Sequence, residues 1–431
     1  MMSLFKGPMR EHIPGHKELS DHVDIKEVKA NNKVYIPLIC GSSVNVDVLV
    51  NEGDHVYVGT KIAQCNERNI VPIYASVSGT IGKIEKRMHS SLKPVNHLVI
   101  ENDGKYEQVQ AFEPLDYKTA DRTTLIDFMM NAGIIGLGGA GFPTYVKYKF
   151  AKDITKLIIN AVECEPFITA DYKMVQAHKE EFVTGIAAMK KMAMAPEVVI
   201  AIKKTHPDLI KFVEDAIKGI EGCSVKAVPD VYPMGWERVL VREIMHKEYD
   251  RLPSEVGAIV NNATTAIAFG EALLYGKPIV TKTLTVSGNA VKEPMNVSVP
   301  VGVPASEVIA ACGGYTCEEV KLIAGGPMMG KTIVNDMFVV DRNMNAITVL
   351  ENKPFDSIAC LRCGKCSDHC PAGLQPVRIA QANKTNDKAT VEKLCAMDCI
   401  ECGLCTYICP SRLDVTENVR RAKRQLMLAK Q

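Results

Sequence analysis

Short hydrophobic runs separated by turn residues occupy the N-terminal quarter of the chain, from residue 33 to residue 101. Their length and their content of β-branched residues are typical of strands. Strands are predicted at residues 34–39, 46–50, 61–64, 76–84 and 97–100. Because glycine, asparagine and aspartate fill the gaps between these runs, as at residues 51–54, the sequence predicts a β domain here.

The pattern changes near residue 120, where apolar strands begin to alternate with longer segments of helical period. Predicted helices cover 123–131, 171–193 and 207–219, and predicted strands cover 157–161, 198–202 and 258–260. Such alternation favours a mostly parallel sheet. Strand character returns between residues 281 and 314, with a short helix at 304–312. Further helices are predicted at 376–382, at 391–397 and after Asp414, whose side chain can cap the last one.

Composition adds limits to this picture. The chain has 431 residues, 47% hydrophobic and 23% charged, with a formal net charge of +1. This length suggests roughly three domains, and the balanced charge disfavours nucleic acid as a partner. No apolar run approaches the ~18 residues of a membrane-spanning helix, and no secretory signal opens the chain. Unpaired thiols in the pattern described next imply a reducing compartment, so we expect a cytoplasmic protein, free or docked on the cytoplasmic face of a membrane.

Cysteine spacing is the strongest chemical signal. The pattern Cys-x2-Cys-x2-Cys-x3-Cys-Pro occurs twice, at residues 360–371 and 399–410, and uses eight of the fifteen cysteines. This spacing is typical of two interlocked [4Fe–4S] clusters, in which the fourth cysteine of each run ligates the other cluster. One cluster is then held by Cys360, Cys363, Cys366 and Cys409, and the other by Cys399, Cys402, Cys405 and Cys370. Zinc ribbons are the alternative, but they use separated cysteine pairs.

A glycine-rich segment follows the helix predicted at 123–131. Gly136, Gly138, Gly139 and Gly141 formally satisfy G-x-G-x-x-G. Taken alone this motif is a weak Rossmann signal, because the preceding strand is very short. Glycines this dense allow backbone amides to approach a phosphate or a ring, and Lys147 could neutralise phosphate charge. We therefore predict a ligand-binding loop.

Polar residues follow two of the predicted strands. Glu163 and Glu165 come just after the strand at 157–161, and Asn261 and Asn262 end the strand at 258–260. Ligands of open α/β sheets gather at the carboxyl ends of strands. The two glutamates could be ribose-binding carboxylates, a general acid/base pair, or a solvated turn.

These motifs resemble a known family. Residues 136–150, 160–171, 232–237 and 260–262 are similar, in order and spacing, to the C subunit of the Rnf electron-transport complex and to the flavin- and NADH-binding subunit of respiratory complex I. The N-terminal strands also resemble the barrel-sandwich domain of lipoyl and biotinyl carriers, although residues 65–69 offer no lysine for modification. The resemblance covers essentially the whole chain.

The resemblance implies an α/β multidomain fold of four parts. A lipoyl-like barrel-sandwich β domain (1–115) is followed by a Rossmann-like α/β domain for FMN and NADH (116–280), a β-grasp module (281–345) and a helical ferredoxin-like domain with two clusters (346–431). The implied FMN residues are Gly136, Gly138, Gly139, Gly141, Lys147, Asn160, Glu163, Asn261 and Asn262. Glu165 and Glu237 are implied to face the nicotinamide nucleotide and to be catalytic. Phe142 and Phe150 match aromatic positions beside it, with burial in the core as the alternative.

The implied activity is oxidation of NADH through FMN, with single electrons leaving through the two clusters to other subunits of a redox complex. Three features favour a paralogue. Trp236 stands where the family usually has Gly or Glu, the N-terminus matches only loosely, and the chain ends at Gln431. Such a paralogue would serve a soluble enzyme such as methylenetetrahydrofolate reductase or D-proline reductase rather than the membrane Rnf complex. A relay or docking subunit without NADH chemistry is the alternative function.

Overall fold

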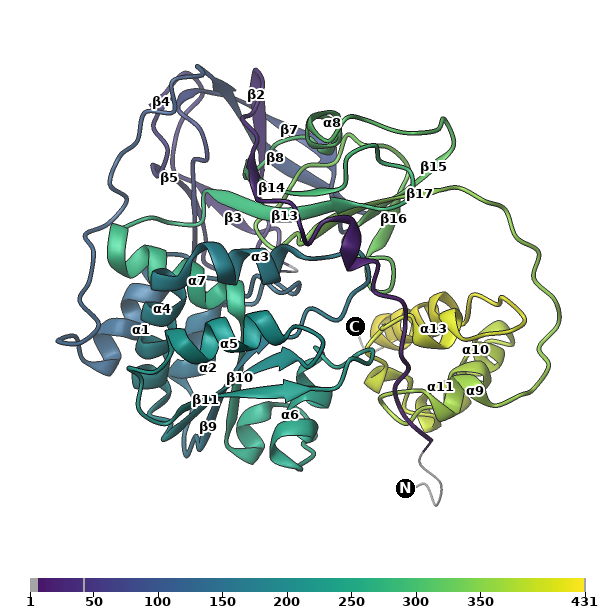
Figure 1. Ribbon diagram of the computed structural model, residues 1–431. Helices are drawn as coiled ribbons and strands as arrows, with labels where there is room; N and C mark the ends of the chain where they lie inside the picture. The colour runs from purple at the N-terminus through teal and green to yellow at the C-terminus, as the bar shows by residue number, and fades with distance from the viewer. Residues whose placement is uncertain (1–6, 42, 430–431) are drawn as a thin grey trace.

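The protein folds into a β-rich half, an α/β layer and a small helical unit, described here by a computed structural model of residues 7–41 and 43–429. In Figure 1 the β sheets lie above the α/β layer, and the C-terminal helices lie beside it. The predicted fold class, with a β domain, an α/β domain, a second β module and a helical C-terminal unit, is confirmed.

The N-terminal β domain consists of a four-stranded sheet, in the order β2-β8-β7-β4, and a three-stranded sheet, in the order β3-β5-β6. Its strands are β2 (Lys33–Pro37), β3 (Val46–Val48), β4 (His55–Val56), β5 (Lys61–Cys65), β6 (Val71–Tyr74), β7 (Gly79–Met88) and β8 (Pro94–Asn102). The strand predicted at 76–84 is wrong at its start, because β7 begins only at Gly79. The sequence also missed β6, in which Pro72 argues against a strand. Proline is tolerated there because β6 is an edge strand.

A parallel four-stranded sheet, in the order β11-β10-β9-β12, forms the α/β layer. Its strands are β9 (Lys156–Ala161), β10 (Glu197–Lys203), β11 (Cys223–Val228) and β12 (Ala258–Asn262). Its helices are α1 (Arg122–Asn131), α2 (Thr144–Lys149), α3 (Ala170–Ala177), α4 (Lys179–Ala193), α5 (Pro207–Ala216), α6 (Glu237–Met245), η2 (Pro253–Val256) and α7 (Ala263–Tyr275). The helix predicted over 171–193 is two helices, because the backbone of His178 leaves the helical region (φ −121°, ψ 55°).

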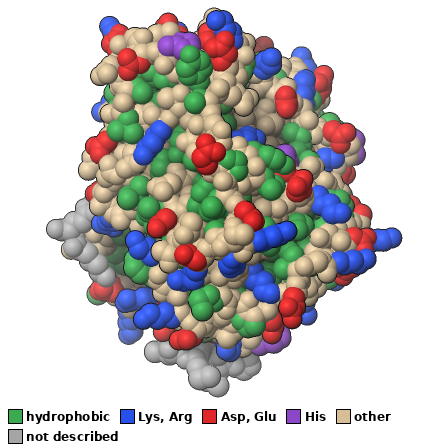
Figure 2. Space-filling view, turned by 90° about the vertical axis from the view of Figure 1, so that its left-hand side faces the viewer, with side chains coloured by type: hydrophobic (Ala, Val, Ile, Leu, Met, Phe, Trp, Pro, Cys, Tyr) green, Lys and Arg blue, Asp and Glu red, His purple; other side chains and the backbone are tan. Residues whose placement is uncertain are grey.

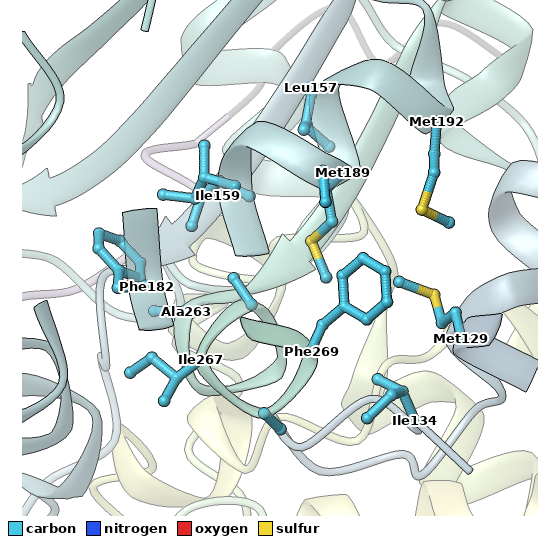
Figure 3. Packing of buried hydrophobic residues seen from close by; sticks show 14 of the residues in the cluster. Met129, Ile134, Leu157, Ile159, Phe182, Met189, Met192, Ala263, Ile267 and Phe269 are labelled. Carbon is cyan, nitrogen blue, oxygen red and sulfur yellow. The ribbon is translucent and has the colours of Figure 1, made fainter. Parts of the chain in front are cut away.

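Successive residues of the central strand β9 face opposite sides of this sheet. Leu157 and Ile159 pack with α1, α4 and α7, whereas Ile158 packs with α6. Figure 3 shows the first of these cores, in which the ring of Phe269 on α7 lies among methionine side chains. Ile134 belongs to the same core and immediately precedes the glycine-rich loop, so the loop begins at a rigid point.

The third part is a six-stranded sheet in the order β1-β14-β13-β17-β15-β16. Its elements are β1 (Lys26–Glu27), β13 (Thr281–Ser287), β14 (Met295–Pro300), α8 (Ala305–Ala311), β15 (Val320–Ala324), β16 (Lys331–Ile333) and β17 (Ala346–Glu351). The N-terminal segment thus supplies β1, and the short helix η1 (Lys17–Leu19) precedes it. This sheet and the N-terminal domain share one hydrophobic core, and β17 lies beyond the boundary expected at residue 345.

Short helices around a core of their own form the C-terminal unit, coloured yellow in Figure 1. They are α9 (Lys365–Asp368), α10 (Pro376–Lys384), α11 (Lys388–Lys393), η3 (Ala396–Asp398), α12 (Leu404–Tyr407) and α13 (Val415–Ala429). The helix predicted at 391–397 is only partly confirmed, because α11 and η3 cover its two ends and Cys395 between them adopts a left-handed conformation (φ 53°). As predicted, the Asp414 carboxylate accepts a hydrogen bond from the Glu417 amide, 3.4 Å away, at the start of α13.

Acidic and basic side chains are interspersed over the face shown in Figure 2, and neither sign dominates it. Across the described residues, no helix combines the length and apolarity that crossing a bilayer requires.

Candidate functional site

The glycine-rich segment 136–142 forms a closed loop. Ile135 pairs with Pro143 in an isolated antiparallel bridge. The Gly136 amide donates to the Phe142 carbonyl at 2.8 Å, and the Gly141 amide donates to the Gly136 carbonyl at 3.2 Å. The loop is thus held in shape by its own backbone.

One side of this loop is open and rich in amide groups. A Cβ atom added at Gly139 (φ 135°) would meet no atom within 4 Å, whereas one at Gly138 would lie 3.1 Å from the Asn262 Cβ. Within the described residues, the amides of Gly138, Gly139 and Ala140 find no acceptor in the protein. Consecutive free amides form a concave site for an anion such as a phosphate. This arrangement fits FMN, which carries one.

Lys147 and Glu237 meet at the end of β12. The Lys147 ammonium donates to the Val260 carbonyl at 2.6 Å and lies 3.4 Å from the Glu237 carboxylate. The other oxygen of Glu237 accepts from the Tyr249 hydroxyl at 3.4 Å. Both side chains of the ion pair keep about a third of their surface exposed, so they can still reach a ligand. Trp236 stands next to them, half-buried, with the Arg238 guanidinium 5.6 Å from its ring centroid.

Three predicted asparagines lie at the carboxyl ends of neighbouring strands, where Asn160 pairs in register with Asn262. Asn160 donates to the Gly235 carbonyl at 2.7 Å, and Asn261 donates to the Tyr148 hydroxyl. Asn262 caps α7 through the Thr264 amide and donates to the Asp171 carboxylate at 2.6 Å. The asparagines are brought together as predicted, and each is held by a partner.

The turn that carries the two glutamates is held by Lys17, which sequence reasoning missed. The Lys17 ammonium donates to the backbone carbonyls of Glu163 (2.9 Å), Glu165 (2.8 Å) and Ile168. Glu163 itself has a left-handed backbone (φ 44°), and its carboxylate accepts from the Asp171 amide at 2.8 Å. No spacing signal points to Lys17, because it lies 146 residues before Glu163 in the chain.

The two glutamates point to different partners. The Glu165 carboxylate accepts from the amides of Met328 (3.2 Å) and Met329 (2.8 Å), in the turn between β15 and β16. A Cβ atom at Gly326 would lie 2.4 Å from this carboxylate, so only glycine fits there. Burial raises the pKa of both Glu163 and Glu165 to about 7. Each carboxyl group can therefore hold or release a proton near neutral pH.

The two predicted aromatic residues are not core residues. Phe142 is 42% exposed and Phe150 is 72% exposed. Phe142 closes the glycine loop, and Phe150 follows α2. The alternative of burial in the core is therefore wrong for both, and their role beside a nucleotide stays a prediction.

Four of the eight cysteines line one cavity. They are Cys370, Cys399, Cys402 and Cys405, the set predicted for one cluster, and we call this the inner site. The fourth cysteine of the first run thus crosses to the second run. The other predicted set, Cys360, Cys363, Cys366 and Cys409, is called the outer site. Its two ends lie close together, because the Ser411 hydroxyl donates to the Ala359 carbonyl at 3.0 Å.

The separation of the cysteines favours a cluster over a single ion. Among the described residues, no three histidine, cysteine, aspartate or glutamate side chains stand close enough together to hold one metal ion. A cubane cluster needs its four thiolates spread around a larger object, and four cysteines around one cavity meet that need. The cavity also has apolar walls, including Leu374, Ile379 and Val419, which exclude water from a buried cluster.

The inner site is packed against the α/β layer and the third sheet. The Tyr232 hydroxyl donates to the Cys402 carbonyl at 2.6 Å. Gly403 is so close to Met328 that an added Cβ atom would lie 2.5 Å from its carbonyl oxygen. Since Met328 also binds Glu165, only a few residues separate the turn at 163–168 from the inner site.

The N-terminal segment reinforces this contact, and in Figure 1 it runs in front of the helical unit. Glu11 pairs with Tyr232 through two backbone hydrogen bonds, of 3.0 and 2.7 Å. Its carboxylate lies 3.0 Å from His369 of the helical unit. The segment therefore bridges the α/β layer and the cysteine runs.

Four family models match successive parts of the chain. They are described as the RnfC barrel sandwich hybrid domain (residues 5–105), the Nuo51 FMN-binding domain (129–270), the SLBB domain (283–332) and the 4Fe-4S dicluster domain (353–411). The glycine loop, the glutamate turn and Asn261–Asn262 fall within the second, and both cysteine runs fall within the fourth.

Curated relatives match over most of their length. The C subunit of the Na(+)-translocating ferredoxin:NAD(+) oxidoreductase complex of Acetobacterium woodii is 34% identical, over 98% of this chain and 97% of the relative. The C subunit of the proton-translocating ferredoxin:NAD(+) oxidoreductase complex of Clostridium ljungdahlii is 31% identical, over 88% and 84%. The C subunit of the ion-translocating oxidoreductase complex of Rhodobacter capsulatus is 34% identical, over 85% and 73%.

Solved structures support the fold. A chain of an NAD+-reducing [NiFe]-hydrogenase in the H2-reduced state superimposes with a TM-score of 0.50 at 16% identity, over 72% of this chain and 62% of that one. At this identity the likeness bears on the arrangement of elements alone.

Proposed function

Since the chain belongs to the family of C subunits of Rnf-type ion-translocating oxidoreductase complexes, we propose that it is the module through which such a complex exchanges electrons with NADH. It is an oxidoreductase subunit with an FMN-binding domain and a domain for two [4Fe–4S] clusters. When bound, FMN exchanges a hydride with NADH and single electrons with the clusters, which relay them. The observation that carries the proposal is the contact between the glutamate turn and the inner cysteine site through Met328.

The open glycine loop is the proposed FMN cradle. Gly136, Gly138, Gly139 and Gly141 hold its backbone open to a phosphate, and Asn160, Glu163, Asn261 and Asn262 lie at or just beyond the carboxyl ends of the neighbouring strands β9 and β12. Lys147 supplies positive charge at the edge of this site, where it is already paired with Glu237. The exposed Phe142 and Phe150 flank the proposed nucleotide position.

The two proposed catalytic glutamates have different tasks. Glu237 is partly exposed beside Lys147, and this exposure supports contact with the nicotinamide nucleotide. Glu165 is buried and held by two amides, and its raised pKa of about 7 lets it keep a proton near the flavin at neutral pH. Neither task requires the side chains to move far from their present partners.

The domain division expected from the sequence is kept in our proposal with one change. Because β17 is hydrogen bonded into the six-stranded sheet, we extend the third module from residue 345 to Glu351. The ferredoxin-like unit then begins in the extended segment that follows.

We place the protein in the cytoplasm or on the cytoplasmic face of a membrane, because all fifteen cysteines are free thiols in the structure. Its proposed partners are the other subunits of a membrane Rnf complex, or subunits of a soluble reductase. The position of Gln431 does not distinguish the membrane complex from the soluble reductase, because this chain aligns with 97% of a relative that is named as a subunit of an ion-translocating complex. Identifying the subunits that co-purify with the chain from native cells under anaerobic conditions decides between them.

The flavin step is tested on the full chain, purified anaerobically with FMN and clusters restored. We expect about one FMN and about eight iron atoms per chain, and bleaching of the flavin on addition of NADH. Gly139→Ala should abolish FMN binding by filling the open side of the loop. Gly104→Ala is the matched control, since Gly104 also has a positive φ and open space around it.

Iron without flavin in the wild-type protein would instead establish the relay alternative, in which the chain only connects partner proteins. Flavin that NADH fails to bleach would exclude the NADH step.

A further inference from the structure

A buried lysine that has no role so far lies beneath the glycine loop. Lys282 lies on β13, the first strand after the α/β layer in the sequence, and is 4% exposed. Its ammonium donates to the Asn345 side-chain oxygen at 2.8 Å and approaches the Leu137 carbonyl at 3.5 Å. Leu137 is part of the loop 136–142, so a charged group from another module reaches the floor of the proposed flavin site.

This ammonium is incompletely paired. It has three hydrogen-bond donors and two acceptors, and among the described residues no carboxylate lies within ion-pair distance of it. Burial lowers the pKa of Lys282 to about 8. The negative charges of Asp171, Glu163 and Asp341 act in the opposite direction but more weakly. A buried charge without a direct counter-ion is unfavourable, so the site favours an added anion.

Other lysines in or near the site have either a carboxylate partner or three carbonyl acceptors, which sets Lys282 apart. Lys17 donates to three carbonyls. Lys203, which is equally buried, forms an ion pair with Asp230 at 2.7 Å. Lys147 is bound to Val260 and Glu237.

Its surroundings connect Lys282 to the open side of the loop. Asp171, the first carboxylate to act on it, accepts from the Asn262 amide at 2.6 Å. Asn262 in turn lies against Gly138, with its Cβ atom 3.1 Å from the position of an added Cβ. Lysine, aspartate and asparagine therefore lie near one another beneath the glycines.

We propose that Lys282 is a further binding residue of the flavin site, at which the third module supplies a positive charge to an anionic group of bound FMN. This inference rests on the proposed function. The anionic group is either the phosphate or the ring, which becomes negative when it is reduced. In both cases the ammonium gains the counter-ion that the protein does not provide.

The test compares Lys282→Met with wild type in the full chain, measuring the dissociation constants of FMN and riboflavin and the midpoint potential of the bound flavin. A phosphate contact predicts FMN binding weakened by about tenfold or more with riboflavin unchanged, as for loss of a charged hydrogen bond. A ring contact predicts that both flavins bind more weakly and that the potential becomes more negative. Lys282→Arg, which keeps the charge, should restore part of the loss.

Lys321→Met, on another strand of the same sheet, is the control for losing a lysine. Unchanged affinities and potential in Lys282→Met would overturn the inference, as would equal weakening of both flavins at an unchanged potential, which indicates a structural role alone. Circular dichroism confirms folding of each variant. Failure of the wild-type chain to bind either flavin would overturn the proposed function itself, and is thus a separate result.

Discussion

The two cysteine runs have the same spacing and nearly the same backbone, yet they lie in different surroundings. Gly364 and Gly403, at matching positions, both have φ 79°, with ψ of −15° and −13°. Each starts a short helix, α9 or α12. In the first run, however, Cys363 and Leu361 are exposed, whereas in the second run the matching Cys402 is buried and the matching Ile400 is partly buried.

From this difference we expect electrons to pass from the inner site to the outer site. The inner site is covered by Tyr232 of the α/β layer, Met328 of the third sheet and Ile13 of the N-terminal segment. The outer site is reached through the exposed segment 352–365, where Phe355, Ile358 and Leu361 are all more than half exposed. The same local motif therefore serves as an internal contact in one copy and faces solvent in the other.

The largest effect is expected from removing one cysteine of each site. Cys402→Ser should remove the inner cluster, about four of the eight iron atoms, and stop electrons from leaving the flavin, because the inner site adjoins it. Cys363→Ser should leave the inner cluster reducible by NADH while abolishing transfer to an external acceptor. Iron analysis and electron paramagnetic resonance after NADH addition measure both outcomes. Equal behaviour of the two variants would contradict the proposed order.

A pH dependence is expected from Glu165, which holds the turn on which the second run rests. Burial raises its pKa from 4.5 to about 7, so the folded state binds the proton more tightly than the unfolded chain. Protonated Glu165 contributes its full stabilisation below about pH 4.5. As pH rises to about 7 this contribution is lost, and the free energy of unfolding falls by about 3 kcal/mol. Glu165→Gln, which carries no titrating group, should remove the part of the decline that comes from Glu165, while Glu163, whose pKa is also raised to about 7, keeps its own part.

Denaturant unfolding of the flavin domain at several pH values measures it. The same replacement at Glu417, on the surface of α13, is the control and should leave the decline in place. A decline in Glu165→Gln as large as that of the wild type would assign it to another carboxyl group.

A matched pair of glycines tests the contact of the second run directly. Gly403→Ala and Gly364→Ala introduce the same backbone strain, about 1 kcal/mol each, because both glycines have a left-handed conformation. Only the first also creates an overlap with the Met328 carbonyl, worth about 1–3 kcal/mol more. Hydrogen exchange at residues 326–330 should therefore rise in Gly403→Ala alone. Similar exchange in both variants would show that the contact does not restrain this turn.

The smallest expected effect concerns a single hydrogen bond between the two halves. Tyr232→Phe removes the donor to the Cys402 carbonyl and should cost about 1 kcal/mol. It should also slow cluster reduction without changing flavin reduction by NADH, which stopped-flow absorbance at the flavin and cluster bands can separate. Tyr407→Phe, on the exposed side of α12, is the control. A slower flavin step would place Tyr232 in the nucleotide site instead.

Much of this site was predictable because its chemistry is local in the sequence. The spacing of the cysteines identified the two cluster sites, and the crossing of Cys370 into the second run followed from the known behaviour of that motif. The glycines at 136–141 and the polar strand ends were also evident. Lys17 and Lys282 were not, because a single lysine far away in the chain carries no periodic or spacing signal.

The sequence by itself determined most element types and the polar residues at the strand ends, and it predicted the cluster ligands, because these depend on spacing and hydrophobic period within short segments. It could not determine which cysteine run packs against the α/β layer, which lysines lie beside the glycine loop and the glutamate turn, or that Glu165 binds the turn between β15 and β16. Those features depend on the close packing around Gly326, Met328 and Gly403, which lie on segments that only folding brings together. Close packing fixes contacts between distant segments that local pattern leaves open.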